Sequence, residues 1–343
     1  MAVLVTGGAG YIGSHMVWAL LDAGEEVVVL DRLSTGFRWA VPDPARFYLG
    51  DVGDRDLLAR IFAENAVDAV LHLAGSIVVP QSVLHPLDYY DNNSAKTGQL
   101  AAAAIQAGIR HFVFSSTAAV YGEVPDGVPV TESAVTLPNN PYGQSKLMAE
   151  QMLRDASAAH DFRYVALRYF NVAGADPAGR AGLSTEGATH LIKIACEAAL
   201  GLRSGVDVYG TDYPTPDGTG IRDYIHVSDL VEAHLKALAY LRRGGQPQVA
   251  NCGYGRGYSV LDVLNAVMRV ERRPFEVRYA PRRAGDTASV VADATRARRL
   301  FGWTPRHDDL DHIVATALRW ERQLNERKFG GLTAIHRRLA ASF

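Results

Sequence analysis

Ala2-Val-Leu-Val-Thr-Gly-Gly-Ala-Gly-Tyr-Ile-Gly13 is the stretch that decides the fold of this chain. Its first five residues are apolar or β-branched, which predicts a buried strand of a parallel sheet. The apolar run at residues 16–21 predicts that a helix follows. The glycines between them therefore form a turn from a strand into a helix, which is the setting in which backbone N–H groups bind a pyrophosphate.

The spacing of this turn and of the next acidic residue is typical of a dinucleotide site. The glycines of the turn are Gly7, Gly10 and Gly13, and a second apolar strand at residues 26–30 ends in Asp31. A carboxylate roughly 20 residues after the turn binds the ribose hydroxyls of NAD and disfavours the 2′-phosphate of NADP. Arg32 follows directly and keeps some NADP binding possible. The sequence therefore predicts NAD as the cofactor.

Length and composition limit the classes of function. The chain has 343 residues, of which 48% are hydrophobic, and a formal net charge of −2. A near-neutral chain is a poor partner for nucleic acid, and no apolar run reaches the roughly 18 residues of a membrane span. We expect no signal peptide, because the first strand starts at residue 2. Two cysteines without metal-type spacing indicate a cytoplasmic protein that has no disulfide and no metal site.

Strand and helix patterns alternate along the first half of the chain. Further strands are predicted at 46–50, 69–74, 110–115 and 164–168, with helices at 54–65, 91–106 and from 142 onward. This alternation predicts an α/β fold with a doubly wound parallel, Rossmann-type sheet, whose ligands bind at the carboxyl ends of the strands. We predict an NAD-binding domain at residues 1–170, which 224–240 and 249–252 rejoin. Residues 171–343 are predicted to form mainly a smaller mixed α/β substrate domain.

Tyr142 and Lys146 are the strongest candidates for catalysis. They lie four residues apart in a run with good helix propensity, so both side chains point to the same face. A free phenol has a pKa of about 10, and a neighbouring cation lowers that value. The pair is therefore a candidate proton shuttle. Taken alone, a surface Tyr–Lys pair is the commoner explanation of this spacing.

These motifs together resemble the extended short-chain dehydrogenase/reductase family. Within that family, the nucleotide-sugar 4-epimerases are similar to the chain over nearly its whole length. The telling segments are residues 5–15, 89–93, 141–148, 167–171, 217–227 and 281–286. The segment Asp217-Gly-Thr-Gly-Ile-Arg-Asp-Tyr-Ile-His-Val227 is much more specific than the glycine turn.

The resemblance assigns roles to residues by their position. It implies that Tyr142 is the catalytic base, Lys146 its electrostatic partner and Thr117 the residue that binds the reactive sugar hydroxyl. The implied NAD-binding residues are Gly7, Gly10, Tyr11, Ile12, Gly13, Asp31, Asp51, Val52, Leu73, Ala74, Gly75, Asn92, Ser115, Tyr142, Lys146 and Tyr169. The implied substrate-binding residues are Thr117, Tyr142, Phe170, Asn171, His190, Leu191, Tyr209, Arg222, Tyr224, Arg283, Asp286 and Val290.

The resemblance also implies an activity. We expect an NAD-dependent interconversion of UDP-glucose and UDP-galactose by transient oxidation at carbon 4, with the N-acetylated sugars as further substrates. A homodimer is expected through the helices near 91–106 and 142–158. An epimerase of UDP-pentoses stays open as an alternative. Ala118-Ala119 argues against a dehydratase, and the intact catalytic trio argues against a non-catalytic nucleotide sensor.

Three positions depart from the family pattern. A lysine that usually follows the Ala74-Gly75 pair is absent from residues 76–80. His190 stands where the family has an asparagine near the diphosphate. Val290 stands where a bulky aromatic residue excludes N-acetyl sugars. The first departure predicts weaker cofactor binding or another base in the same role, and the last predicts a wider sugar pocket.

Overall fold

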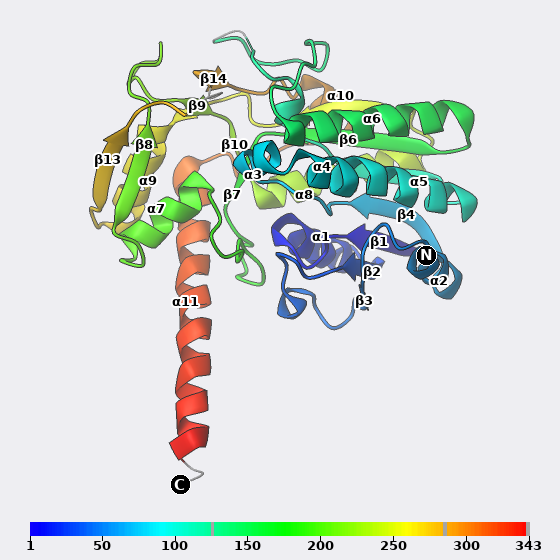
Figure 1. Ribbon diagram of the computed structural model, residues 1–343, viewed down its shortest axis with the longest axis horizontal. Helices are drawn as coiled ribbons and strands as arrows, with labels where there is room; N and C mark the ends of the chain where they lie inside the picture. The colour runs from blue at the N-terminus through cyan, green and yellow to red at the C-terminus, as the bar shows by residue number, and fades with distance from the viewer. Residues whose placement is uncertain (125–126, 284–286, 341–343) are drawn as a thin grey trace.

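A seven-stranded parallel sheet forms the centre of the computed structural model, which describes residues 1–124, 127–283 and 287–340, with 328–340 described as backbone. The strand order is β11-β6-β5-β4-β1-β2-β3 (Figure 1). The strands are β1 (Ala2–Thr6), β2 (Glu26–Asp31), β3 (Arg46–Leu49), β4 (Val67–His72), β5 (His111–Ser115), β6 (Arg163–Tyr169) and β11 (Gln248–Cys252). The predicted Rossmann-type fold is confirmed. The strand order reverses beside β1. Sheets of this kind bind nucleotides at the carboxyl ends of the strands next to such a reversal.

Helices cover both faces of this sheet. Alternate residues of each strand point to opposite faces, so Val3 and Val5 of β1 pack in one core cluster and Leu4 packs in the other. The first face is covered by α1 (Tyr11–Asp22) and α8 (Val227–Arg242). The opposite face is covered by α2 (Arg55–Glu64), α5 (Lys96–Gln106) and α6 (Pro141–Ala159).

The helix predicted at 91–106 differs at its start. A π-helical turn, η2 (Tyr90–Ala95), precedes α5. The side chains of Asn92 and Asn93 in this turn hydrogen-bond Ser76 after β4. Such π turns are common at functional sites because they re-aim side chains out of the helix.

Three small sheets and a group of three helices lie to one side of the large sheet (Figure 1). The sheets are β7 (Asn171–Ala173) with β10 (Tyr224–His226), β8 (Gly205–Tyr209) with β13 (Glu276–Ala280), and β12 (Tyr258–Ser259) with β9 (Ile221–Arg222) and β14 (Ser289–Val290). The helices α7 (Leu191–Ala199), α9 (Val260–Glu271) and α11 (Leu310–Ala340) contact one another. The division into two domains near residue 170 stays a prediction. Within the described ranges, none of the helices is long and apolar enough to cross a membrane.

Candidate active site

The glycine turn is a tight cradle at the N-terminus of α1. Gly7 has a φ of +73°, which favours glycine. A Cβ added to Gly13 would lie 1.9 Å from the carbonyl oxygen of Gly7, so only glycine fits there. Tyr11 and Ile12 begin the helix directly after Gly10. The cradle thus leaves backbone N–H groups and the positive helix end for a pyrophosphate, and it fits NAD.

Asp31 occupies the end of β2, beside this cradle. Its Oδ2 accepts a hydrogen bond from the Ala9 N–H at 2.9 Å, and its Oδ1 accepts one from the Leu33 N–H at 2.7 Å. Two backbone donors fix the orientation of the carboxylate. The structure therefore places the predicted ribose-binding acid next to the glycine turn.

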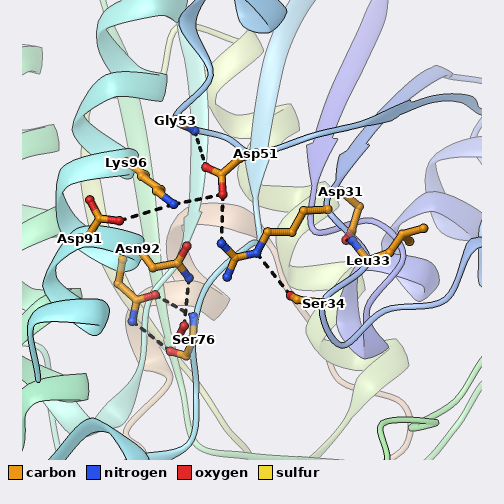
Figure 2. Close-up of polar contacts among 11 residues, drawn as sticks. Asp31, Leu33, Ser34, Asp51, Gly53, Ser76, Asp91, Asn92 and Lys96 are labelled. Carbon is orange, nitrogen blue, oxygen red and sulfur yellow. Dashed lines mark hydrogen bonds and ion pairs between the residues drawn. The ribbon is translucent and has the colours of Figure 1, made fainter. Parts of the chain in front are cut away.

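Asp51 follows β3, the strand next to β2, and binds two cations (Figure 2). Its carboxylate accepts hydrogen bonds from Arg32 Nη1 at 2.9 Å, Lys96 Nζ at 3.0 Å and the Gly53 N–H at 2.8 Å. Burial raises the pKa of Asp51, but the Gly53 N–H and the two cations outweigh it and lower the pKa overall. The neighbouring Val52 is buried. Lys96 and Arg32 are contacts that the sequence analysis did not assign.

The segment after β4 lies between the glycine turn and the catalytic lysine. A Cβ on Gly7 would lie 2.7 Å from the Ala74 nitrogen, and one on Gly75 would lie 3.2 Å from Lys146 Nζ. The Leu73 N–H donates to the Thr6 carbonyl at 3.1 Å, which continues the strand ladder. The sheet therefore brings the predicted residues of β1, β4 and α6 together.

Two asparagines of η2 hold Ser76, the residue that follows Gly75. Asn92 Nδ2 donates to Ser76 Oγ at 2.9 Å. Asn93 accepts from the Ser76 N–H at 2.7 Å and donates to its carbonyl at 2.9 Å. Asn93 was not predicted from the sequence as a site residue. Its position beside Asn92 in the 89–93 segment is the only signal that could have indicated it.

The catalytic candidates Thr117, Tyr142 and Lys146 are all buried at one end of the sheet. Pro141 at the first helical position and the Asn140 side chain, which accepts from the Gly143 N–H at 2.9 Å, begin α6 and so fix Tyr142 in its first turn. Lys146 Nζ donates to the Ser115 carbonyl at 2.9 Å.

Burial controls the protonation of this group. It raises the pKa of the Tyr142 phenol, although a hydrogen bond with Thr117 lowers it in part. It also lowers the pKa of Lys146 to about 8, against a smaller opposing effect of the Glu150 charge. The expectation that Lys146 keeps the pKa of Tyr142 below its ordinary value is therefore not met in this structure. The physical reason is that both groups are desolvated.

A buried ionic network behind the trio was also missed from the sequence. Ser116 Oγ donates to Glu150 Oε1 at 2.5 Å, and Arg168 donates to both oxygens of the same carboxylate at 2.9 and 2.5 Å. Ser116 lies between Ser115 and Thr117, so the network anchors the segment that carries both predicted site residues. The sequence offered one signal of this network: Glu150 lies four residues after Lys146, on the same face of the predicted helix.

Ser115, whose carbonyl binds Lys146, also contacts Tyr169. Ser115 Oγ lies 3.0 Å from Nε2 of the buried His234. Burial and the neighbouring Tyr142 raise the pKa of Tyr169, and a hydrogen bond with Ser115 opposes this. Tyr169 therefore stays a neutral hydroxyl, and its role as a cofactor contact stays a prediction.

Part of the predicted substrate set lines one cavity. Its walls include Asn171, His190, Leu191 and Tyr224, together with Tyr11 of the cofactor set. The parallel pairing of β7 with β10 places Asn171 opposite Tyr224. His190 Nδ1 is buried and has no hydrogen-bond partner among the described residues. Burial and the nearby Lys193 charge lower the pKa of His190, so a neutral imidazole faces the cavity.

The other predicted substrate residues that the structure describes do not belong to that cavity wall. Arg222 and Val290 are paired residues of β9 and β14. The Arg283 guanidinium lies 3.7 Å from the ring centroid of Tyr209. The remaining two are Phe170, which packs against a small apolar cluster that includes Leu147, and Asp286, which lies outside the described residues.

Comparisons with known proteins agree with this geometry. Residues 3–253 match the model of the NAD dependent epimerase/dehydratase family. A UDP-glucose 4-epimerase of Azospirillum brasilense is 58% identical over 324 residues, covering 94% of this chain and 93% of that protein. A Bifidobacterium longum UDP-glucose 4-epimerase, solved with NAD+ and UDP, is 39% identical with a TM-score of 0.88, covering 94% and 98% of the two chains.

A third similar protein has two substrates in its name. The Campylobacter jejuni UDP-Glc/GlcNAc 4-epimerase is 45% identical with a TM-score of 0.82, over 94% of this chain and 99% of that one. The family match spans most of the chain, and the relatives match nearly their full length. The glycine cradle, the buried Tyr142–Lys146 pair and these matches lead to one conclusion: the chain belongs to the NAD dependent epimerase/dehydratase family.

Proposed function

We propose that this chain inverts carbon 4 of UDP-hexoses and so interconverts UDP-glucose and UDP-galactose, with NAD as its resident cofactor. The observation that carries the proposal is the position of Tyr142. Its phenol is buried and hydrogen-bonded with Thr117, one helical turn before the buried Lys146 in α6, at the sheet edge that also holds the glycine cradle. Names of the similar proteins support the substrate.

NAD held by the glycine turn and Asp31 would supply the oxidant that takes the hydride of carbon 4 and the reductant that gives it back. Tyr142 takes the proton of the 4-hydroxyl as that hydride leaves, and Thr117 orients the hydroxyl. Lys146 keeps its charge close to the developing phenolate, which lowers the cost of ionising a buried phenol. The resulting 4-keto sugar turns over, so that the hydride would return to the opposite face of carbon 4 while Tyr142 returns the proton to the oxygen on that carbon.

Turning the sugar requires that the enzyme hold the nucleotide and not the hexose. We assign the diphosphate to Asn171, His190 and the N-terminus of α7, because they border one cavity and a helix N-terminus attracts anions. Arg222 and Arg283 are the permanent cations assigned to the same diphosphate. Asp286 is proposed for the uridine ribose, by family resemblance alone.

A coupled assay tests the proposal. The purified chain is supplied with UDP-galactose, and UDP-glucose is detected through an added UDP-glucose dehydrogenase. We expect turnover without net consumption of NAD by the epimerase itself. Turnover of UDP-arabinose with none of UDP-galactose would instead assign the pentose reaction, and release of water from the sugar would indicate a dehydratase.

A second substrate class is favoured by Val290. This residue is partly exposed on β14, directly opposite Arg222, and its side chain is short. We propose that the 2-acetamido group of UDP-N-acetylglucosamine fits beside it, as the name of the Campylobacter jejuni enzyme suggests. A Val290→Tyr variant should lose this activity and keep most of its activity on UDP-galactose. Equal loss on both sugars would contradict the assignment.

A homodimer and a cytoplasmic location complete the proposal. Helices α3 (Val79–Leu84) and α4 (Pro86–Tyr89) contact α6 (Figure 1). Their side chains Val83, Leu84 and Leu87 are 61%, 74% and 77% exposed, an apolar surface that suits a second copy.

Both cysteines of the chain are free and buried, which is typical of reducing compartments.

Light scattering tests the homodimer. We expect Leu87→Asp to shift the wild-type dimer toward the monomer. Leu49→Asp is the matched control, because Leu49 is also exposed, at 65%, but lies at the far edge of the sheet on β3. A monomeric wild-type chain would contradict the dimer.

A further inference from the structure

An arginine to which the family resemblance assigns no role lies beside the predicted ribose-binding acid. Arg32 directly follows Asp31 at the end of β2. An arginine at such a position accommodates the 2′-phosphate of NADP in dinucleotide-binding folds. Its planar guanidinium suits bidentate phosphate binding. Asp31 and Arg32 therefore favour opposite cofactors.

The guanidinium of Arg32 is turned toward Asp51. Arg32 Nη1 bonds Asp51 Oδ2 at 2.9 Å, and Arg32 Nε donates a long hydrogen bond to Ser34 Oγ at 3.4 Å. The Asp31 carboxylate is occupied separately by the N–H groups of Ala9 and Leu33. Arg32 thus points along the sheet edge, toward the strand next to its own.

Asp51 is itself fixed by its own loop and by one helix. The Gly53 N–H holds one carboxylate oxygen, and Lys96 of α5 holds the other. Lys96 also pairs with Asp91 of η2 at 3.4 Å. A carboxylate anchored in this way is a defined acceptor for Arg32, not a mobile surface acid.

We propose that Asp51 determines cofactor choice by holding Arg32 away from the 2′ position of the adenosine ribose. Selection of NAD over NADP then depends on the Arg32–Asp51 pair as well as on the repulsion of a 2′-phosphate by Asp31. The inference rests on the proposed placement of NAD on the glycine turn. It adds Arg32 and Asp51 as a specificity pair to that site.

The size of the effect follows from exposure. The side chains of Arg32 and Asp51 are 43% and 31% exposed. Ion pairs of this kind contribute little in water, so we expect a shift in cofactor preference of about threefold to tenfold. Asp31 remains in place and keeps NAD the better cofactor.

Asp51→Asn is the test variant, because it keeps the shape and one acceptor oxygen and removes the charge that holds Arg32. The full-length protein is incubated with equal concentrations of NAD and NADP until exchange is complete, and the bound nucleotides are then released and quantified. We expect the bound NADP-to-NAD ratio to rise by about threefold to tenfold relative to the wild type. An unchanged ratio would overturn the proposal.

A second pair of variants separates the release of Arg32 from the loss of a negative charge. Arg32→Ala alone should leave the ratio close to that of the wild type, because the guanidinium is already withheld. Asp51→Asn with Arg32→Ala should lose most of the gain. If the double variant keeps the gain, Asp51 acts only by repelling phosphate, and the proposal is wrong.

Lys96→Met is the matched control, because it removes the other cation on Asp51 and leaves Arg32 bound. Its ratio should stay within about twofold of the wild type, a change within the range of a single surface charge. An increase as large as that of Asp51→Asn would overturn the proposal. Since the assay contains no sugar, an NAD-binding chain that fails on UDP-hexoses would contradict only the proposed function. A chain that binds neither dinucleotide would contradict both.

Discussion

The cofactor edge and the nucleotide-sugar side of this molecule are built in different ways. The cofactor edge consists of residues at the ends of β1, β2, β3, β4 and β5, five strands of one hydrogen-bonded sheet. The proposed nucleotide-sugar side uses strands of two to five residues in separate small sheets and the loops between them. The fold therefore positions the oxidising half of the site, whereas long side chains must complete the half that grips the nucleotide.

The largest effect should follow from removing the Tyr142 hydroxyl. Tyr142→Phe deletes the proton acceptor and leaves the glycine cradle and the diphosphate residues intact. We expect kcat on UDP-galactose to fall by at least about a hundredfold, with bound NAD and the Kd for UDP unchanged. Near-normal turnover in this variant would remove Tyr142 from the mechanism.

The cradle itself is tested by Gly13→Ala. The new methyl group would clash with the Gly7 carbonyl, so the turn must open. Overpacking of this kind costs about 2–3 kcal/mol, which is roughly 30- to 150-fold in NAD affinity. Gly98→Ala in α5 is the control, since its Cβ would meet only the flexible Met152 sulfur at 3.3 Å. Equal NAD affinity in the two variants would contradict the placement of the pyrophosphate.

Arg222→Ala tests the proposed nucleotide-sugar side. Loss of a charge-assisted contact should weaken UDP binding by about 10- to 100-fold and leave NAD affinity unchanged. Calorimetric titration of the NAD-loaded protein with UDP measures the first quantity, and titration of the NAD-free protein with NAD measures the second. An unchanged Kd for UDP would show that Arg222 does not bind the diphosphate and that the cavity at Asn171 and His190 is sufficient to bind UDP.

A smaller effect is expected from pH. Lys146 has a pKa of about 8 in this structure, lowered by burial, so its charge is present below that pH and lost above it. We therefore expect kcat to decrease as the pH rises through about 8 and beyond. Lys146→Arg should lose this alkaline limb whatever its absolute rate, because a guanidinium stays charged. An identical limb in the variant would assign the titration to another group.

The same shift predicts how stability depends on pH. Lys146 binds its proton less tightly in the folded chain than in the unfolded chain, where its pKa is about 10.4. The folded state is therefore disfavoured at neutral pH by the buried charge, and this penalty decreases as the pH rises from about 8 to above 10.

The sequence predicted the cofactor edge well, because the sheet determines both the apolar pattern of its strands and the spacing between the glycine turn and Asp31. Residues 2–6 and 26–30 were predicted as strands, and the structure has β1 and β2 there, with Asp31 beside the glycine turn. The residue roles at this edge stay predictions, although the structure brings Gly75 and Lys146 together as they require.

Long-range side-chain contacts could not be predicted in the same way. The Arg168–Glu150–Ser116 network joins three segments that are distant in the sequence. The pairing of Arg32 with Asp51 depends on which strand lies next to β2. On the nucleotide-sugar side, the separation of Arg222 from the Asn171 cavity depends on how the short strands pair, and their local sequences carry little periodicity.

The contrast between a preformed cofactor edge and a substrate side completed by ligand is tested most directly by hydrogen exchange. The NAD-loaded protein is compared with and without UDP. We expect UDP to slow exchange in residues 209–224 and 287–291, and to leave residues 2–13 and 111–117 unchanged. Protection that increased mainly in the glycine turn and β5, with none in the short strands, would contradict the account.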